Sequence, residues 1–169
     1  YGANGKLQLS IPIIHSHKNR QLYKDVKISN TEKWPQIHWK SLEAAYRTSP
    51  FFEYYEDELK VFFENKHSQH FQLGIESIEL TCELLGIKLH LGITENYETA
   101  PTAMDMRNAW NKRDYASNPL AHDFPEYIQV FSDRHPFSAD LSILDLLFCL
   151  GPQAKQYLQN LKFREFKNQ

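Results

Sequence analysis

The chain has 169 residues, which suits one domain, and its 41% hydrophobic and 24% charged residues are ordinary for a globular protein. A formal net charge of -2 argues against a nucleic-acid or membrane-surface protein, and no apolar run approaches the roughly 20 residues that span a bilayer. Cys82 and Cys149 make no disulfide framework, so a cytoplasmic location is predicted.

Two segments near the start alternate apolar and polar residues, which is the pattern of a half-buried strand. The first covers 7–13 and the second 22–28, so a hairpin with a basic loop is predicted. Pro12 lacks an amide donor and therefore indicates an edge or an end of the first strand. Shorter strands are predicted at 89–93 and 127–131.

Three helices are predicted in the first half of the chain. Pro35 suits the first turn of one helix, and Pro50, preceded by a serine cap, suits the first turn of the next. The third helix, over 71–85, has the most regular apolar spacing in the sequence, and Gly86 supplies its end.

Residues 98–126 show no periodicity and contain three prolines. Loops longer than roughly 12–15 residues are uncommon inside a compact domain and tend to be functional or disordered. Because the segment also contains Trp110, we expect an ordered, lid-like loop that this tryptophan anchors.

The stretch LSILDLLFCLGP predicts a buried helix whose few polar residues suit the positions that begin and end a helix. Ser142 suits the N-cap, Asp145 can reach back to the cap amide, and Gly151 suits the C-terminal end. The alternative is functional: Ser142, Asp145 and Cys149 form one stripe that faces a pocket. A last helix is predicted from Pro152 to about residue 166.

These elements together predict an α+β fold, with a small, mostly antiparallel sheet packed against a layer of helices in a single domain, 1–169. The sequence contains no HExxH, CxxC, P-loop or GxGxxG motif. Neither a metal site nor a cofactor is therefore predicted.

Several unusual short motifs occur in this sequence in the same order as similar motifs of the WbqC-like family, which the chain therefore resembles. YIQVF, HPF and LSILDLLFCLGP resemble its C-terminal part, while LQLSIPI, WPQIHWKSLEAAYRTSPFFEYYEDEL and DMR at 105–107 resemble earlier parts. Family members are bacterial proteins encoded with genes for surface polysaccharides, the O-antigen and the capsule. They carry a Gln-Tyr-Pro-like segment and an Asn-Arg pair before the first of these motifs, so the domain is expected to be incomplete at its N-terminus. The resemblance implies a pathway more than a reaction.

Two residues are predicted as catalytic. His38 lies on one helical face with Leu42, where an imidazole is either a satisfied core group or a general base. A satisfied core group is the more common case, and the resemblance adds weight to the second reading, because this histidine belongs to the family's pattern. Asp145 is the other candidate, on the condition that its carboxylate and His38 share one pocket.

Four further residues are predicted to bind substrate. Tyr46 and Tyr127 can place hydroxyl groups at a pocket rim, or can simply fill the core. Gln129 lies on the same predicted strand face as Tyr127 and can recognise a sugar or face water. Arg107 can bind a phosphate or carboxylate from the long loop, or form a solvated pair with Asp105.

The leading functional hypothesis is an enzyme of surface-polysaccharide synthesis that transfers an acyl or aminoacyl group to a nucleotide-linked amino sugar. The alternative is a non-catalytic scaffold or binding module for other enzymes of that pathway. The expected partners are a nucleotide-linked sugar or another small-molecule substrate, and then a second copy of the chain or pathway enzymes. Neither nucleic acid nor a membrane span is expected.

Overall fold

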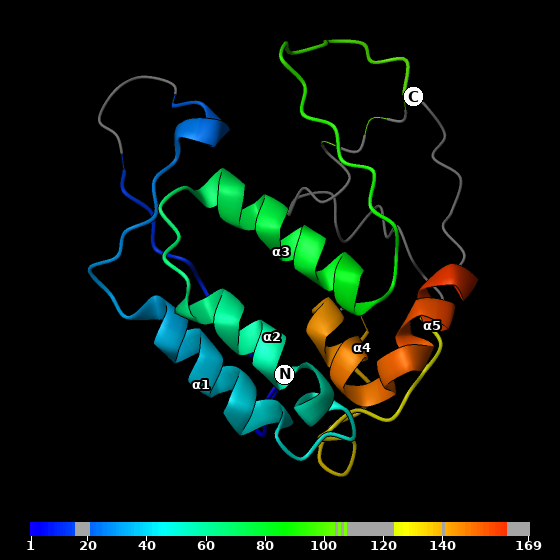
Figure 1. The fold of residues 1–169 in the computed structure, drawn as a ribbon. Helices are drawn as coiled ribbons and strands as arrows, with labels where there is room; N and C mark the ends of the chain where they lie inside the picture. Colours follow the sequence, from blue (N-terminus) through cyan, green and yellow to red (C-terminus); the bar gives the residue numbers. More distant parts are fainter. Residues whose placement is uncertain (16–20, 104, 106, 108–123, 140, 162–169) are drawn as a thin grey trace.

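Helices dominate the computed structural model, which describes residues 1–15, 21–103, 105, 107, 124–139 and 141–161 (Figure 1). In chain order the helices are η1 (Tyr23–Asp25), α1 (Trp34–Tyr46), α2 (Phe52–Glu64), α3 (His70–Leu84), α4 (Ile143–Leu150), η2 (Gly151–Gln153) and α5 (Ala154–Asn160). Figure 1 shows α1 and α2 side by side, with α4 between α2 and α5. None of the described helices has the length and apolar character needed to cross a membrane.

The predicted α+β fold is wrong, because the described residues form no β-sheet. Three isolated antiparallel bridges take its place: Gly2 with Gly5, Ile13 with Ile28, and Lys27 with Gln69. Several apolar side chains of the predicted strands stay in solvent, with Leu7 and Leu22 52% and 60% exposed, whereas Ile28 is buried against Trp34 and Leu73 of the helices. Alternation therefore produced extended segments without a continuous buried face, and a sheet needs such a face to be stable in water.

The same correction applies to each of the other predicted strands. Residues 23–25 form the short helix η1, so the expected hairpin is reduced to the single bridge between Ile13 and Ile28. Segment 89–93 is exposed and makes no bridge among the described residues. Segment 127–131 enters a turn in which the Ser132 amide donates to the Gln129 carbonyl oxygen. Hydrogen bonds within a turn satisfy this backbone where a sheet partner is missing.

The three helices predicted in the first half of the chain are confirmed as α1, α2 and α3. Trp34, His38, Leu42 and Ala45 form the buried face of α1, at the spacing of three and four residues that keeps side chains on one side. This face packs against α2 in a core that also contains Phe148 of α4.

Helix α4 is the most buried helix of the structure, with five of its eight residues buried. The predicted cap is confirmed, because the Leu144 amide donates to the Ser142 hydroxyl over 3.3 Å. The helix ends at Gly151, whose φ is +53° and whose absent Cβ would lie 2.5 Å from the Phe51 ring. A glycine therefore allows the chain to turn tightly against Phe51.

Two expectations fall partly outside the described residues. Helix α5 ends at Asn160, and residues 162–169 of the predicted last helix lie beyond the described part. Of segment 98–126, the described residues form no helix or strand. Trp110 lies outside the described residues, so its anchoring of a lid stays a prediction.

Candidate functional site

Four of the six predicted site residues meet around one carboxylate. Asp145 has no exposed surface. Its Oδ1 accepts a hydrogen bond from the Tyr46 hydroxyl over 2.8 Å, and its Oδ2 accepts one from the Tyr127 hydroxyl over 2.6 Å. The Gln129 amide nitrogen lies 3.3 Å from Oδ2. We call these four residues the Asp145 network.

Three separate segments position the network. Tyr46 is the last residue of α1, Asp145 lies in the first turn of α4, and Tyr127 and Gln129 precede α4. The Gln129 amide is fixed by the Ser138 backbone, which accepts from Nε2 and donates to Oε1, each over 2.9 Å. These partners determine which end of the side-chain amide is the oxygen and which is the nitrogen.

The network surrounds the Asp145 carboxyl group with neutral donors. Burial, reinforced by the adjacent Asp145 side chain, raises the pKa of Tyr46 and of Tyr127 far above the usual range of a phenol. Both hydroxyls therefore stay protonated and donate. Within the described residues no lysine, arginine or histidine pairs with Asp145. A buried polar group is costly unless it is hydrogen-bonded, and here the two hydroxyls supply those bonds.

The expected capping role of Asp145 is wrong. Its side chain bonds to Tyr46, Tyr127 and Gln129, whereas the predicted partner was the amide of Ser142. The alternative interpretation is not confirmed either, because Ser142 lines one hollow, Cys149 lines another and Asp145 lines neither of them.

A hollow of about 560 Å³ lies beside the network, and we call it the Tyr127 hollow. Its wall includes Ser49, Tyr127, Gln129, Asp133 and Cys149, but Asp145 is behind that wall. Burial raises the pKa of the Cys149 thiol to about 12, so it stays protonated and is a poor nucleophile. The other cysteine, Cys82, is half-buried.

His38 lies in a different place, between rings and a backbone carbonyl. Its Nε2 donates to the Ser10 carbonyl oxygen over 3.1 Å, and the Trp34 ring stands edge-on with centroids 5.2 Å apart. Burial lowers the pKa of His38. The neutral ring with its proton on Nε2 therefore keeps a lone pair on Nδ1, as a general base requires.

His38 lines a cavity of about 390 Å³, which we call the His38 cavity. Its walls come from α1, α2, α3 and the beginning of α4, where Ser142 and Leu144 contribute. His38 lines this cavity and not the Tyr127 hollow, and Asp145 lines neither of the two. Neither hollow therefore brings the two predicted catalytic residues together.

Arg107 is also apart from the other candidates. Its Nε donates to Asp105 over 2.8 Å, Nη1 donates to the Glu98 carbonyl oxygen over 2.7 Å, and its guanidinium lies over the Tyr97 ring. The same arginine lowers the pKa of the Asp105 carboxyl to about 2. The arrangement corresponds to the solvated pair that was the alternative reading of these residues.

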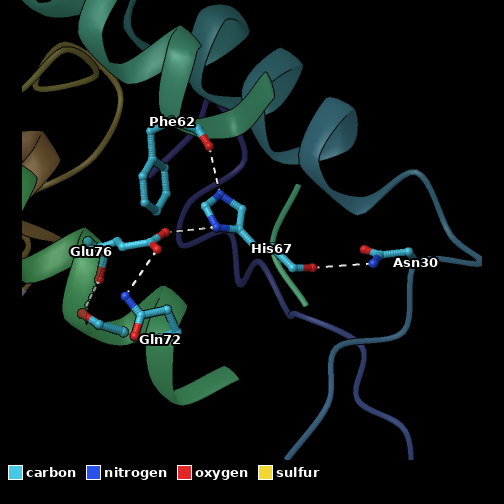
Figure 2. Close-up of polar contacts among 7 residues, drawn as sticks. Asn30, Phe62, His67, Gln72 and Glu76 are labelled. Atoms are coloured by element: carbon cyan, nitrogen blue, oxygen red, sulfur yellow. Dashed lines mark hydrogen bonds and ion pairs between the residues drawn. The ribbon is translucent and has the colours of Figure 1, made fainter. Parts of the chain in front are cut away.

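One buried polar residue was not among the six predicted site residues (Figure 2). His67 is 6% exposed; its Nε2 lies 2.7 Å from the Phe62 carbonyl oxygen and its Nδ1 lies 3.1 Å from a Glu76 carboxylate oxygen. His67 ties the end of α2 to α3, and its separation of nine residues from Glu76 has no local sequence pattern.

The described chain contains no group of three or more histidines, cysteines, aspartates or glutamates that could hold a metal ion. His70, which forms a pair with His67 at a spacing of three residues, directs its Nδ1 to the Tyr23 hydroxyl over 3.0 Å. The two histidines therefore have separate partners.

Fold and site define a helical protein in which a fully buried carboxylate and a buried neutral histidine lie near two separate hollows. The chain belongs to the WbqC-like protein family, whose model matches residues 2–124. It is 24% identical over 181 residues to the Mycobacterium tuberculosis protein Rv1507c, whose name describes it as uncharacterized; the match covers 93% of this chain and 78% of that protein. No solved structure matches the chain at a significant level.

Proposed function

We propose that this protein is a cytoplasmic transferase of O-antigen or capsule synthesis that moves an acyl or aminoacyl group onto the amine of a nucleotide-linked sugar. Membership of the WbqC-like family supports the pathway, through the genes with which the family is encoded. The state of His38 carries the choice of reaction: a neutral imidazole, held by a carbonyl at Nε2, in the wall of a cavity.

The proposed step uses this imidazole as a general base. The sugar amine attacks the carbonyl carbon of an acyl thioester, a C–N bond forms, and the nitrogen loses a proton to Nδ1 of His38. The C–S bond then breaks, and the departing sulfur takes that proton from His38. Such proton transfer by a positioned side chain contributes about 10²- to 10⁴-fold in rate.

Asp145 receives a different part in this proposal, because a carboxylate without exposed surface cannot touch a substrate. It orients Tyr127 and Gln129, which do line a hollow and can meet sugar hydroxyl groups. Tyr46 supports Asp145 from the opposite side. We propose Arg107 as the contact for the nucleotide phosphates, a role that requires its guanidinium to exchange Asp105 for phosphate oxygens.

A scaffold for other pathway enzymes is the second candidate. One observation favours it: neither the His38 cavity nor the Tyr127 hollow brings together His38, Tyr127 and Asp145. A scaffold needs exposed surface more than a shared pocket.

A transfer assay distinguishes the two functions. The protein is incubated with acetyl, glycyl or octanoyl thioesters and nucleotide-linked amino sugars, and both thiol release and the mass of the acylated sugar are measured. We expect turnover that falls at least about 100-fold in His38→Gln. His90→Gln is the matched control, because His90 is exposed and lies in neither hollow. Absence of both turnover and nucleotide-sugar binding would leave the scaffold as the better account.

A further inference from the structure

The His38 cavity has almost no polar group available for a ligand. The hydroxyls of Ser77 and Thr81 in its wall donate to carbonyl oxygens of their own helix, over 2.8 Å in each case. Ser142 accepts the cap bond from Leu144. Within the described residues the lining contains no lysine, arginine, aspartate or glutamate. A nucleotide or a sugar would therefore lose its hydration in this cavity without replacement.

The His38 cavity is partly open to solvent, and Ile78 in its wall is 46% exposed. A volume of about 390 Å³ falls in the range of roughly 300–1,000 Å³ that is typical of small-molecule sites.

Gly74 helps to keep the space open. It lies inside α3 and lines the cavity, and a Cβ added there would meet no atom within 4 Å. A glycine inside a helix costs about 0.5–1 kcal/mol relative to alanine. Glycine at this position therefore lowers the stability of α3, although a larger side chain would have room to enter the cavity.

A residue of the wall also has a hydrogen-bond donor without a partner. Trp34 is 2% exposed and lines the cavity, and its indole N–H is buried beneath the wall with no acceptor among the described residues. An unmade bond of this kind costs about 1–3 kcal/mol. Trp34 is in edge-on contact with His38, so this donor lies close to the neutral base, and a ligand can reach it only if the wall shifts.

We propose that the His38 cavity binds the apolar acyl chain of a carboxylic acid or its thioester. The aliphatic and aromatic walls hold the chain, and the carbonyl group lies at the end formed by Trp34 and His38. This inference rests on the proposed transfer for its meaning in catalysis, and it narrows the donor from any acyl or aminoacyl group to an aliphatic one.

Binding of simple alkyl carboxylates to the full chain tests the proposal. Octanoate is compared with acetate and with octyl sulfate, by calorimetry and by the shift in melting temperature, since a ligand of the folded state raises apparent stability. We expect saturable binding of octanoate and none of acetate. Octyl sulfate has a similar chain without a carbonyl, and equal binding of it would overturn the role given to the carbonyl end.

Filling the cavity is the second arm of the test. Gly74→Leu should weaken octanoate binding at least tenfold, while Gly92→Leu, at an exposed glycine whose added Cβ also meets no atom within 4 Å, should leave it unchanged. Ser77→Met on the same wall decides the matter if Gly74→Leu does not fold.

Two results would overturn the inference. One is undiminished octanoate binding in a folded filling variant. The other is the absence of octanoate binding in the wild type. If Gly74→Leu is then also strongly destabilised, other residues of this protein fill the cavity in solution and leave no room for a ligand. Failure of the transfer assay with intact octanoate binding would count against the proposed function alone. Transfer of acetyl or glycyl groups without octanoate binding would count against this inference alone.

Discussion

Asp145 illustrates how a polar residue in an apolar helix acquires a partner far away in the sequence. The spacing of Ser142, Asp145 and Gly151 fits a capped helix, and two of these three positions do have that role. Asp145 differs because Tyr46, 99 positions earlier, donates to it. Local pattern explains a cap, but a bond between segments depends on how the helices pack.

The strength of this bond can be measured with a double-mutant cycle. Tyr46→Phe leaves a buried carboxylate oxygen without its donor, so we expect the free energy of unfolding to fall by about 1–3 kcal/mol. Combining it with Asp145→Asn should give a coupling energy of about 0.5–3 kcal/mol in urea titrations. Tyr54→Phe, at a hydroxyl on a side chain that is 74% exposed, is the control and should change stability by less than about 0.5 kcal/mol. Additive effects would contradict a direct bond.

The buried histidine of α1 should make stability depend on pH. Burial lowers the pKa of His38 below its usual value of 6.5, so the unfolded chain takes up a proton at a pH where the folded chain does not. The free energy of unfolding should therefore fall as the pH drops below about 6.5, until the lowered pKa is reached. The difference between wild type and His38→Gln isolates this contribution. A parallel pair of stability curves from pH 7 to pH 5 would disprove it.

At the scale of elements, helices were predicted well and strands were not. The apolar face of α1 recurs every three to four residues, and glycines and prolines mark the ends of several helices, so these signals are contained in one segment. A strand needs a partner strand and a second layer, and alternation along a single segment specifies neither. Ile13 and Ile28 do form an antiparallel bridge, but the residues on either side of them do not extend it into a β-ladder.

Two glycines of similar appearance should respond in opposite ways to alanine. Gly151 has a φ of +53° and would place a Cβ 2.5 Å from Phe51, so Gly151→Ala should lower the free energy of unfolding by about 1–3 kcal/mol or more. Gly74→Ala adds a methyl group to open space inside α3 and should raise it by about 0.5–1 kcal/mol. The comparison is made by chemical denaturation of the wild type and the two variants, provided that the unfolding free energy falls with denaturant concentration at the same slope in all three. A stabilised Gly151→Ala would show that the turn is built differently.

At the scale of the whole molecule, burial is uneven. Five residues of α4 are buried, whereas Leu73 is the one buried residue of the longer helix α3, which borders the His38 cavity. Elements with few buried contacts open first. We expect amide hydrogen exchange to be slowest in α4 and α1, and faster by at least tenfold in the middle of α3. Equal protection would indicate one cooperative unit, and octanoate should slow exchange in α3 if it fills the cavity.

The candidate site was predictable by residue type but not by arrangement. Tyr46, Tyr127, Gln129 and Asp145 were selected singly, as polar groups in apolar surroundings, and packing places them together. His38 was selected by the same rule and lies at another hollow. The rule identifies buried polar groups, but membership of one site depends on contacts between helices. Their roles stay a prediction.

The long separation between Tyr46 and Asp145 has a consequence for synthesis on the ribosome. The core of α1 and α2 is covered in part by Leu80 and Leu84 of α3 but is completed by Phe148, so part of their apolar faces stays uncovered until about 100 further residues have been translated. At about 5–20 residues per second, that interval lasts about 5–20 s. The nascent chain therefore exposes two amphipathic helices for longer than most folding steps take, and it is a suitable client for a chaperone that binds near the exit tunnel.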